Sequence, residues 1–166
     1  RPVLDATYSA GPELSGVGVY SRQLITHLAD AHPYQIFTLA YRPHRLRAAL
    51  FERIPRNCRR RLLTELGLLA RCDIFHGLNQ RLPRRSCRRS VVTFHDLFVM
   101  TGEYSTPEFR QRFSEQAAHA ASRADLIIAV SEFTADQVHA LLAVERARIR
   151  VIHHGVTPRP PASESR

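Results

Sequence analysis

The chain has 166 residues, of which 44% are hydrophobic and 23% are charged, with 7 glycines, 10 prolines and 3 cysteines. This composition excludes collagen-like, disordered and disulfide-framework proteins, and the length predicts one domain with a hydrophobic core of its own. Lysine is absent, and 24 arginines against 15 acidic residues give a net charge of +9. Such a charge attracts phosphate groups, nucleic acid or anionic lipid, or only keeps the surface solvated.

The first half of the chain alternates short apolar runs with a helical pattern. Val3 and Leu4 begin a first predicted strand, and residues 35–40 predict a second. Between them, residues 17–31 carry apolar side chains at steps of three and four, which indicates an amphipathic helix that Pro33 closes. Residues 42–61 are the least legible stretch, and we expect a weak helix there that runs into a basic loop interrupted by proline.

The second half repeats the alternation. Residues 74–75, 91–94, 126–130 and 149–152 predict four further strands, and the third of these runs is apolar on successive residues, as in strands buried on both faces. Thr106 and Ser131 are capping residues that start two helices. The alternation predicts an α/β fold, a Rossmann-like, doubly wound, mostly parallel sheet with helices on both faces, over residues 1–156. Residues 157–166 are rich in proline and predict a linker or tail.

The cysteine pattern and the lack of a predicted leader or membrane span bear on the cellular compartment of the protein. Cys58, Cys72 and Cys87 are odd in number and contain no CxxC pair, which favours free thiols in a reducing cytosol over a metal site. No apolar run approaches the roughly 18 residues of a membrane span, and the first residues carry no secretory leader and look trimmed. We therefore expect a cytoplasmic protein.

Polar side chains follow the predicted strands where each strand ends. Because the carboxyl ends of parallel strands share one edge of the sheet, these side chains are expected to line a common ligand crevice. Each also has a purely structural interpretation, for example Ser131 as a helix cap and His95 as a hydrogen-bonded structural histidine. Adjacent histidines on an extended segment point in opposite directions, so the last two are not expected to share a metal. The residues concerned are His76, Asn79, His95, Asp96, Ser131, Glu132, His153 and His154.

Gly16 and Gly18 open the first helix, where backbone N–H groups and the helix dipole favour a phosphate. Their spacing differs from a dinucleotide-binding fingerprint, because about ten residues separate the first strand from Gly16 and Ser21 stands in place of the third small residue. The second strand is followed by Arg42 rather than by an acid, so NAD is disfavoured.

Five segments, residues 16–20, 73–77, 91–97, 124–132 and 148–156, resemble in this order the N-terminal half of a GT-B glycosyltransferase of family 4. The resemblance spans nearly the whole chain and implies an acceptor-side domain facing a C-terminal domain that holds a nucleotide-sugar donor. It implies retention of anomeric configuration, no metal and no cofactor. We expect a piece of a longer enzyme or a detached domain, which folds but transfers no sugar without its donor-binding half.

The resemblance also implies residue roles. His95 would be the catalytic residue facing the reacting sugar or acceptor, and Gly16 and Gly18 would approach the donor diphosphate. The acceptor pocket would be formed by His76, Asn79 and Asp96, and the rest of the cleft by Ser131, Glu132 and His154. The last segment departs from the family pattern Pro-Asn-Gly-Val-Asp, because His153 and His154 replace its proline and asparagine.

Two other interpretations of the arginines stay open. One is a basic phosphate- or nucleic-acid-binding α/β module, although residues 42–61 offer little beyond Phe51 for base stacking. The other is contact of residues 59–71 with anionic lipid at the inner face of a membrane, against a packed helix with a basic rim. The partners expected are the missing C-terminal domain and a sugar or lipid-linked acceptor.

Overall fold

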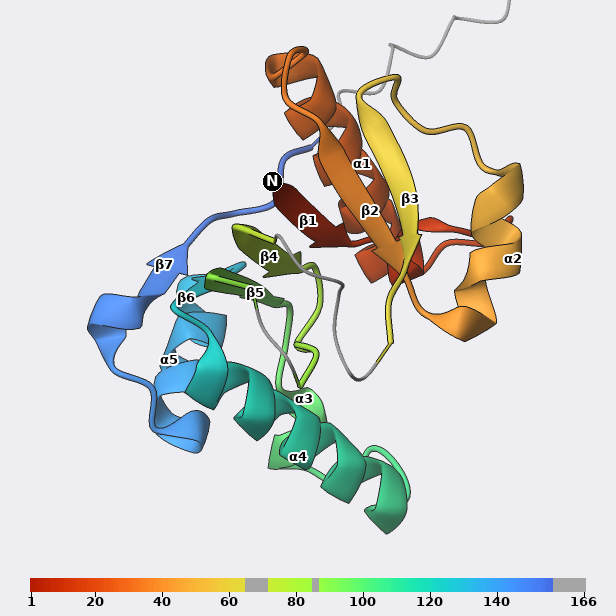
Figure 1. The fold of residues 1–166 in the computed structure, drawn as a ribbon. Coiled ribbons are helices and arrows are strands. Elements are labelled where there is room, and N and C mark those ends of the chain that lie inside the picture. Colours follow the sequence, from red (N-terminus) through yellow and green to blue (C-terminus); the bar gives the residue numbers. More distant parts are fainter. Residues whose placement is uncertain (65–71, 85–86, 157–166) are drawn as a thin grey trace, which may run out of the picture.

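The computed structural model describes residues 1–64, 72–84 and 87–156. These residues form a seven-stranded sheet in the order β3-β2-β1-β4-β5-β6-β7, with every neighbouring pair parallel (Figure 1). The strands are β1 (Pro2–Asp5), β2 (Phe37–Tyr41), β3 (Cys58–Leu62), β4 (Ile74–Gly77), β5 (Arg89–Phe94), β6 (Leu126–Ala129) and β7 (Ile149–Val151). The α-helices are α1 (Gly16–Ala31), α2 (Pro43–Phe51), α3 (Phe98–Thr101), α4 (Pro107–Arg123) and α5 (Glu132–Leu142).

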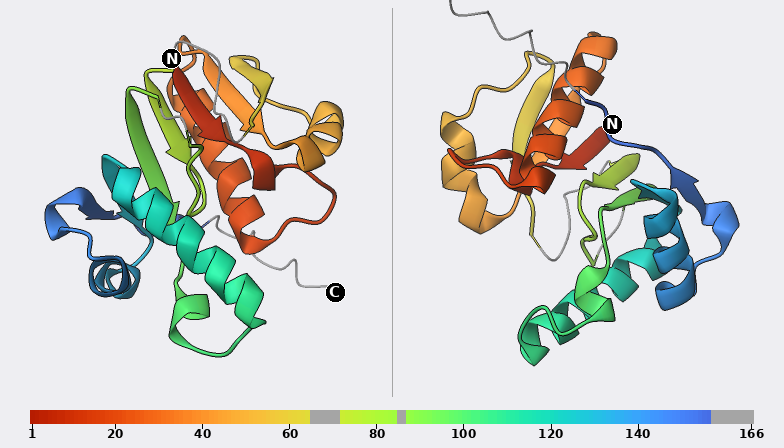
Figure 2. Two further views of the ribbon diagram at one scale, coloured as in Figure 1. Left: turned by 60° about the horizontal axis from the view of Figure 1, so that its bottom comes forward. Right: turned by 180° about the vertical axis from the view of Figure 1, so that it is seen from behind.

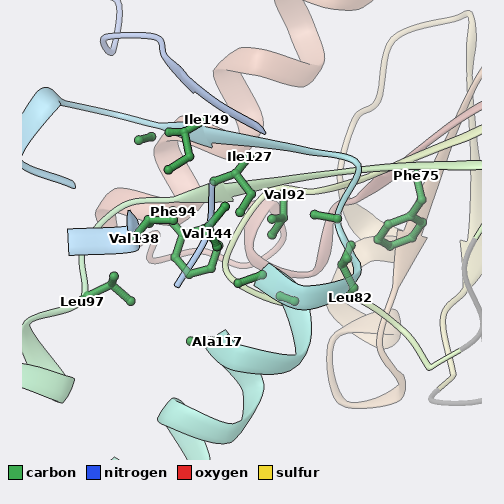
Figure 3. Close-up of a cluster of buried hydrophobic side chains, with 14 of the residues drawn as sticks. Phe75, Leu82, Val92, Phe94, Leu97, Ala117, Ile127, Val138, Val144 and Ile149 are labelled. Atoms are coloured by element: carbon green, nitrogen blue, oxygen red, sulfur yellow. The ribbon is translucent and has the colours of Figure 1, made fainter. Parts of the chain in front are cut away.

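Helices cover both faces of this sheet. Successive residues of each strand point to opposite faces, so neighbouring residues pack against different helices. Val3 packs with Phe75 and with the small residues of α4, whereas Leu4 packs with Leu39 and with Ile25 of α1. Figure 2 shows α1 and α4 on opposite sides of the sheet, and Figure 3 shows part of the α4-side cluster. The predicted Rossmann-like fold is therefore confirmed.

The strand order reverses direction between β1 and β4. Chain order runs outward from β1 through β2 to β3 on one side, and from β4 through β5 and β6 to β7 on the other. In open α/β sheets the connections on the two sides of such a point leave toward opposite faces and open a crevice at the carboxyl ends of the strands. The ends of β1 and β4 are therefore the expected place for a ligand.

Residues 42–61 contain more regular structure than the sequence indicated. The weak helix is confirmed as α2, but the end of the predicted loop is β3, which pairs with β2 from Cys58 opposite Phe37 to Leu62 opposite Tyr41. Three consecutive arginines hide this strand, because charged side chains are tolerated on a strand that lies at the edge of a sheet. The alternative of a helix from residue 59 is thus wrong for residues 59–62, and residues 65–71 and 157–166 lie outside the described residues.

The expectation of three free thiols is wrong for two of them. Cys58 is a free, buried thiol, but Cys72 and Cys87 form a disulfide. Because Ile74 lies opposite Arg89 in the β4–β5 pair, the residues two positions earlier also lie opposite each other, although 15 positions separate them in the chain. The argument from free thiols to a reducing compartment therefore rests on Cys58 alone. Across the described ranges, none of the helices has the length and apolar character that a bilayer crossing requires.

Candidate functional site

A buried threonine joins two of the predicted site elements on the α1 side of the sheet. Thr93, on β5, has its hydroxyl oxygen 2.9 Å from Nε2 of His76 on β4 and 3.2 Å from the phenol oxygen of Tyr20 on α1. Burial raises the pKa of Tyr20, so its phenol stays neutral over the physiological range. The sequence offered one signal for Thr93, since it is the polar residue inside the apolar run 91–94.

His95 and His154 complete an aromatic cluster around Tyr20. The ring centroid of Tyr20 lies 4.7 Å from that of His95 and 4.9 Å from that of His154, and the two histidine rings are 5.3 Å apart. These residues come from α1, from the end of β5 and from the segment after β7, so the sheet brings together three stretches that are far apart in sequence. The sequence placed Tyr20 in the apolar stripe of its helix and in the segment 16–20, and gave it no role in the site.

A backbone carbonyl selects the tautomer of the neutral His95 ring. Its Nε2 lies 3.0 Å from the carbonyl oxygen of Leu78, and because a carbonyl can only accept, Nε2 carries the proton and Nδ1 is the acceptor. Burial lowers the pKa of His95, and burial together with His95 lowers the pKa of His76 to about 4. Both imidazoles are therefore neutral at pH 7 and can exchange hydrogen bonds with uncharged hydroxyl groups.

A cavity of about 540 Å³ lies beside this cluster. Its wall combines polar groups, among them Tyr20, His76 and His154, with apolar side chains such as Val19 and Ile152. Gly16, at the first turn of α1, also lines it, and apart from its chain neighbours and its own helix backbone no described residue lies within 4 Å of the position that a Cβ on Gly16 would take. The helix N-terminus is therefore accessible from the cavity, which keeps the predicted approach of a diphosphate to Gly16 sterically feasible.

Gly18 has a packing explanation. A Cβ on this residue would lie 2.6 Å from the carbonyl oxygen of Tyr8, and the Gly18 amide donates to the hydroxyl of Ser15, which caps α1. The glycine is thus required for α1 to pack on the turn that follows β1. Its predicted contact with a donor phosphate stays a prediction.

The other predicted residues divide into those near the cluster and those turned elsewhere. Asn79 accepts a hydrogen bond from the amide of Gln80 and shapes the loop after β4, while Asp96 and Glu132 are exposed. Nδ1 of His153 lies 3.2 Å from the carbonyl oxygen of Val130 and His154 stacks on Tyr20, and both histidines line the cavity. In the described part of the chain, no three His, Cys, Asp or Glu side chains are placed to hold a metal ion.

Ser131 is the N-cap of α5, as the sequence predicted, and its hydroxyl accepts from the amide of Thr134 at 3.1 Å. We expect Ser131→Ala to lower the free energy of unfolding by about 1 kcal/mol, because the amide of Thr134 loses its partner at the start of the helix. Urea unfolding followed by circular dichroism measures this. Ser131→Asp, which restores an acceptor, is the control, and equal stability of the alanine variant and the unaltered chain would contradict the capping role.

Comparison with known proteins adds to this geometry. The sequence model of the protein family Glycosyltransferase Family 4 matches residues 14–159 of this chain. O-antigen chain mannosyltransferase B of Escherichia coli is 36% identical over 77 residues, which are 46% of this chain and 20% of that protein.

Solved structures share the fold. Sucrose-phosphate synthase from Thermosynechococcus elongatus superposes with a TM-score of 0.62 at 16% identity, over 94% of this chain and 48% of that one. The wall teichoic acid polymerase TagF superposes with a TM-score of 0.56 at 12% identity, over 92% of this chain and 37% of that one. The chain thus spans less than half the length of each of these three proteins.

Proposed function

The chain belongs to glycosyltransferase family 4 and has the Rossmann-like fold of the N-terminal half of GT-B enzymes, and on this basis we propose that it is the acceptor-side domain of a retaining, nucleotide-sugar-dependent hexosyltransferase. The observation that carries the proposal is the aromatic cluster of Tyr20, His95 and His154 beside a large cavity at the N-terminus of α1. The family match does not favour the alternative of a nucleic-acid-binding module.

The chemistry asked of this domain is the orientation of uncharged hydroxyl groups near a departing diphosphate. In the reaction, the bond from the sugar to the diphosphate breaks and a bond to the acceptor oxygen forms, while the acceptor proton leaves with the diphosphate or to solvent. Nδ1 of His95 can accept a hydrogen bond from a hydroxyl of the donor sugar or of the acceptor substrate. Nε2–H of His95 donates to the carbonyl oxygen of Leu78. The exposed first turn of α1 at Gly16 places the positive end of the helix dipole toward the diphosphate.

This domain supplies one wall of the reaction site. Charge develops on both the departing diphosphate and the sugar, and donors fixed in advance around both are what lowers such a barrier. We infer that the chain alone folds but transfers no sugar, because the groups that would hold the nucleotide belong to another domain. The relative from Escherichia coli is named a mannosyltransferase, so nucleotide-activated mannose is the first donor to assay.

The test compares the chain of residues 1–166 with the longest natural polypeptide that contains it. Release of nucleotide and appearance of glycosylated product are measured with mannose and other hexose donors. We expect product from the longer polypeptide, no product from the chain alone, and loss of product in the longer His95→Ala variant. His44→Ala, at an exposed position on α2, is the matched control. Turnover by the chain alone, or equal activity of the two variants, would overturn the proposal.

A further inference from the structure

A second cavity, of about 300 Å³, lies on the opposite side of the same sheet edge. It is placed where the strand order reverses, because Arg42 directly follows β2 and the loop after β4 provides Arg81 and Arg84. Gln116 and His119 of α4 close it from the helix side. This is the crevice in which open α/β sheets bind their ligands.

The charge of this cavity is positive. Its lining contains three arginines and one carboxylate, that of Glu115. The buried Asp5 forms an ion pair with Arg42, with 3.9 Å between Oδ2 of Asp5 and Nε of Arg42. The side chain of Arg42 is only 9% exposed. The positive charge of these arginines is thus held in a partly desolvated place. Such charge favours an anionic ligand.

The donors of the cavity are also oriented. Nε of Arg81 donates to Oε1 of Gln116 at 2.6 Å, which fixes one side of the guanidinium, and among the described residues its terminal nitrogens stay available for a ligand. Within residues 1–64, 72–84 and 87–156, neither Arg81 nor Arg84 forms an ion pair with a carboxylate. On the same helix as Gln116, Nε2 of His119 is buried without a hydrogen-bond partner in the described part of the chain. A buried polar atom of this kind is costly unless a ligand satisfies it.

We propose that this cavity, lined by Arg42, Arg81, Arg84, Gln116 and His119, is a binding site for a phosphate group. Guanidinium groups pair with phosphate through two parallel hydrogen bonds, which suits the fixed fork of Arg81. The volume accommodates a phosphate with a small attached group such as one sugar ring.

The position of the cavity gives the phosphate a function. The loop after β4 passes from one face of the sheet to the other, since Leu78 packs in the α1-side cluster and Leu82 in the α4-side cluster. His95 contacts this loop at Leu78, and Arg81 lies three residues further on. A phosphorylated acceptor held by Arg81 would thus reach around the sheet edge toward His95. This assignment of the phosphate to the acceptor rests on the proposed function, whereas phosphate binding itself does not.

The binding test titrates the chain with inorganic phosphate at constant ionic strength. The readouts are the NMR shifts of the His119 ring and of the arginine Nε–H groups, with calorimetry for the dissociation constant. We expect saturable binding that Arg81→Gln and Arg84→Gln each weaken by about tenfold, because each removes a charge-assisted contact. Arg84 is exposed, so its variant is expected to fold even if Arg81→Gln does not.

Arg47→Gln, at an exposed position on α2, is the matched control and is expected to bind phosphate as the unaltered chain does. Equal weakening by all three variants would indicate diffuse attraction to a basic surface and would overturn the proposal, as would the absence of saturable shifts. Calorimetry with a hexose 1-phosphate and with vesicles containing phosphatidic acid separates a soluble sugar phosphate from a lipid headgroup as the source of the phosphate.

The two proposals fail separately. If the longer polypeptide glycosylates neutral sugars in preference to phosphorylated ones, the assignment to the acceptor is wrong while the phosphate site stands. If that polypeptide transfers no sugar, the proposed function is wrong, and the phosphate titration still decides the nature of the cavity.

Discussion

Replacing Gly77 by alanine is expected to lower the free energy of unfolding by about 3 kcal/mol, at the upper end of what overpacking a folded protein costs. A Cβ at this position would lie 2.2 Å from the carbonyl oxygen of Arg81 and 3.2 Å from that of Asn79. Both are backbone atoms, and the amide of Arg81 donates to the carbonyl of Asn79, so the turn cannot yield without opening. Urea unfolding followed by circular dichroism measures the loss.

The same substitution is expected to disturb both cavities. Opening the turn moves Leu78, whose carbonyl orients His95, and it moves Arg81 at the phosphate site. Gly16→Ala is the matched control, because among the described residues no tertiary contact lies within 4 Å of its Cβ position. Its free energy of unfolding should change by less than about 0.5 kcal/mol. A Gly77→Ala variant as stable as the Gly16→Ala variant would contradict the close approach of the two backbone segments.

The part of the fold that could be predicted is the part set by local patterns. Runs such as residues 126–130 are apolar on successive residues because β6 lies inside the sheet, between β5 and β7, with one face buried and the other partly buried. The capping role of Ser131 is set within four positions of the chain. The sheet edge that collects His76 and His95 follows from the parallel alternation alone. The fold class and the neighbourhood of the candidate site were accordingly within reach of the sequence.

What escaped prediction depends on pairing between distant residues. The disulfide between Cys72 and Cys87 needs the β4–β5 register, and the cavity at Arg81 needs β2, the loop after β4 and α4 to meet. Arginines in such a cavity look like any solvated basic residues when they are read along the chain. β3 was missed for a related reason, since an edge strand carries charges that an interior strand would not tolerate.

The stability of the chain is expected to fall by up to about 3 kcal/mol between pH 7 and pH 4 through the titration of His76. Burial, and then the proximity of His95, hold the pKa of His76 at about 4, whereas the unfolded imidazole has its ordinary value of 6.5. Between these two values the unfolded chain binds a proton that the folded chain does not, so stability is fully present above pH 6.5 and is lost as the pH falls. Burial also lowers the pKa of His95, which adds to the loss in the same direction.

Urea unfolding at several pH values between 4.5 and 7 measures this dependence, and the comparison with His76→Gln isolates it. A glutamine can still contact the hydroxyl of Thr93 but does not titrate, so the variant should be less sensitive to acid than the unaltered chain. The comparison is needed because burial raises the pKa of Asp5, and this effect favours the folded state as the pH falls. His44→Gln, exposed on α2, should keep the full dependence. If His76→Gln also keeps the full pH dependence, His76 is not the group whose titration lowers the stability.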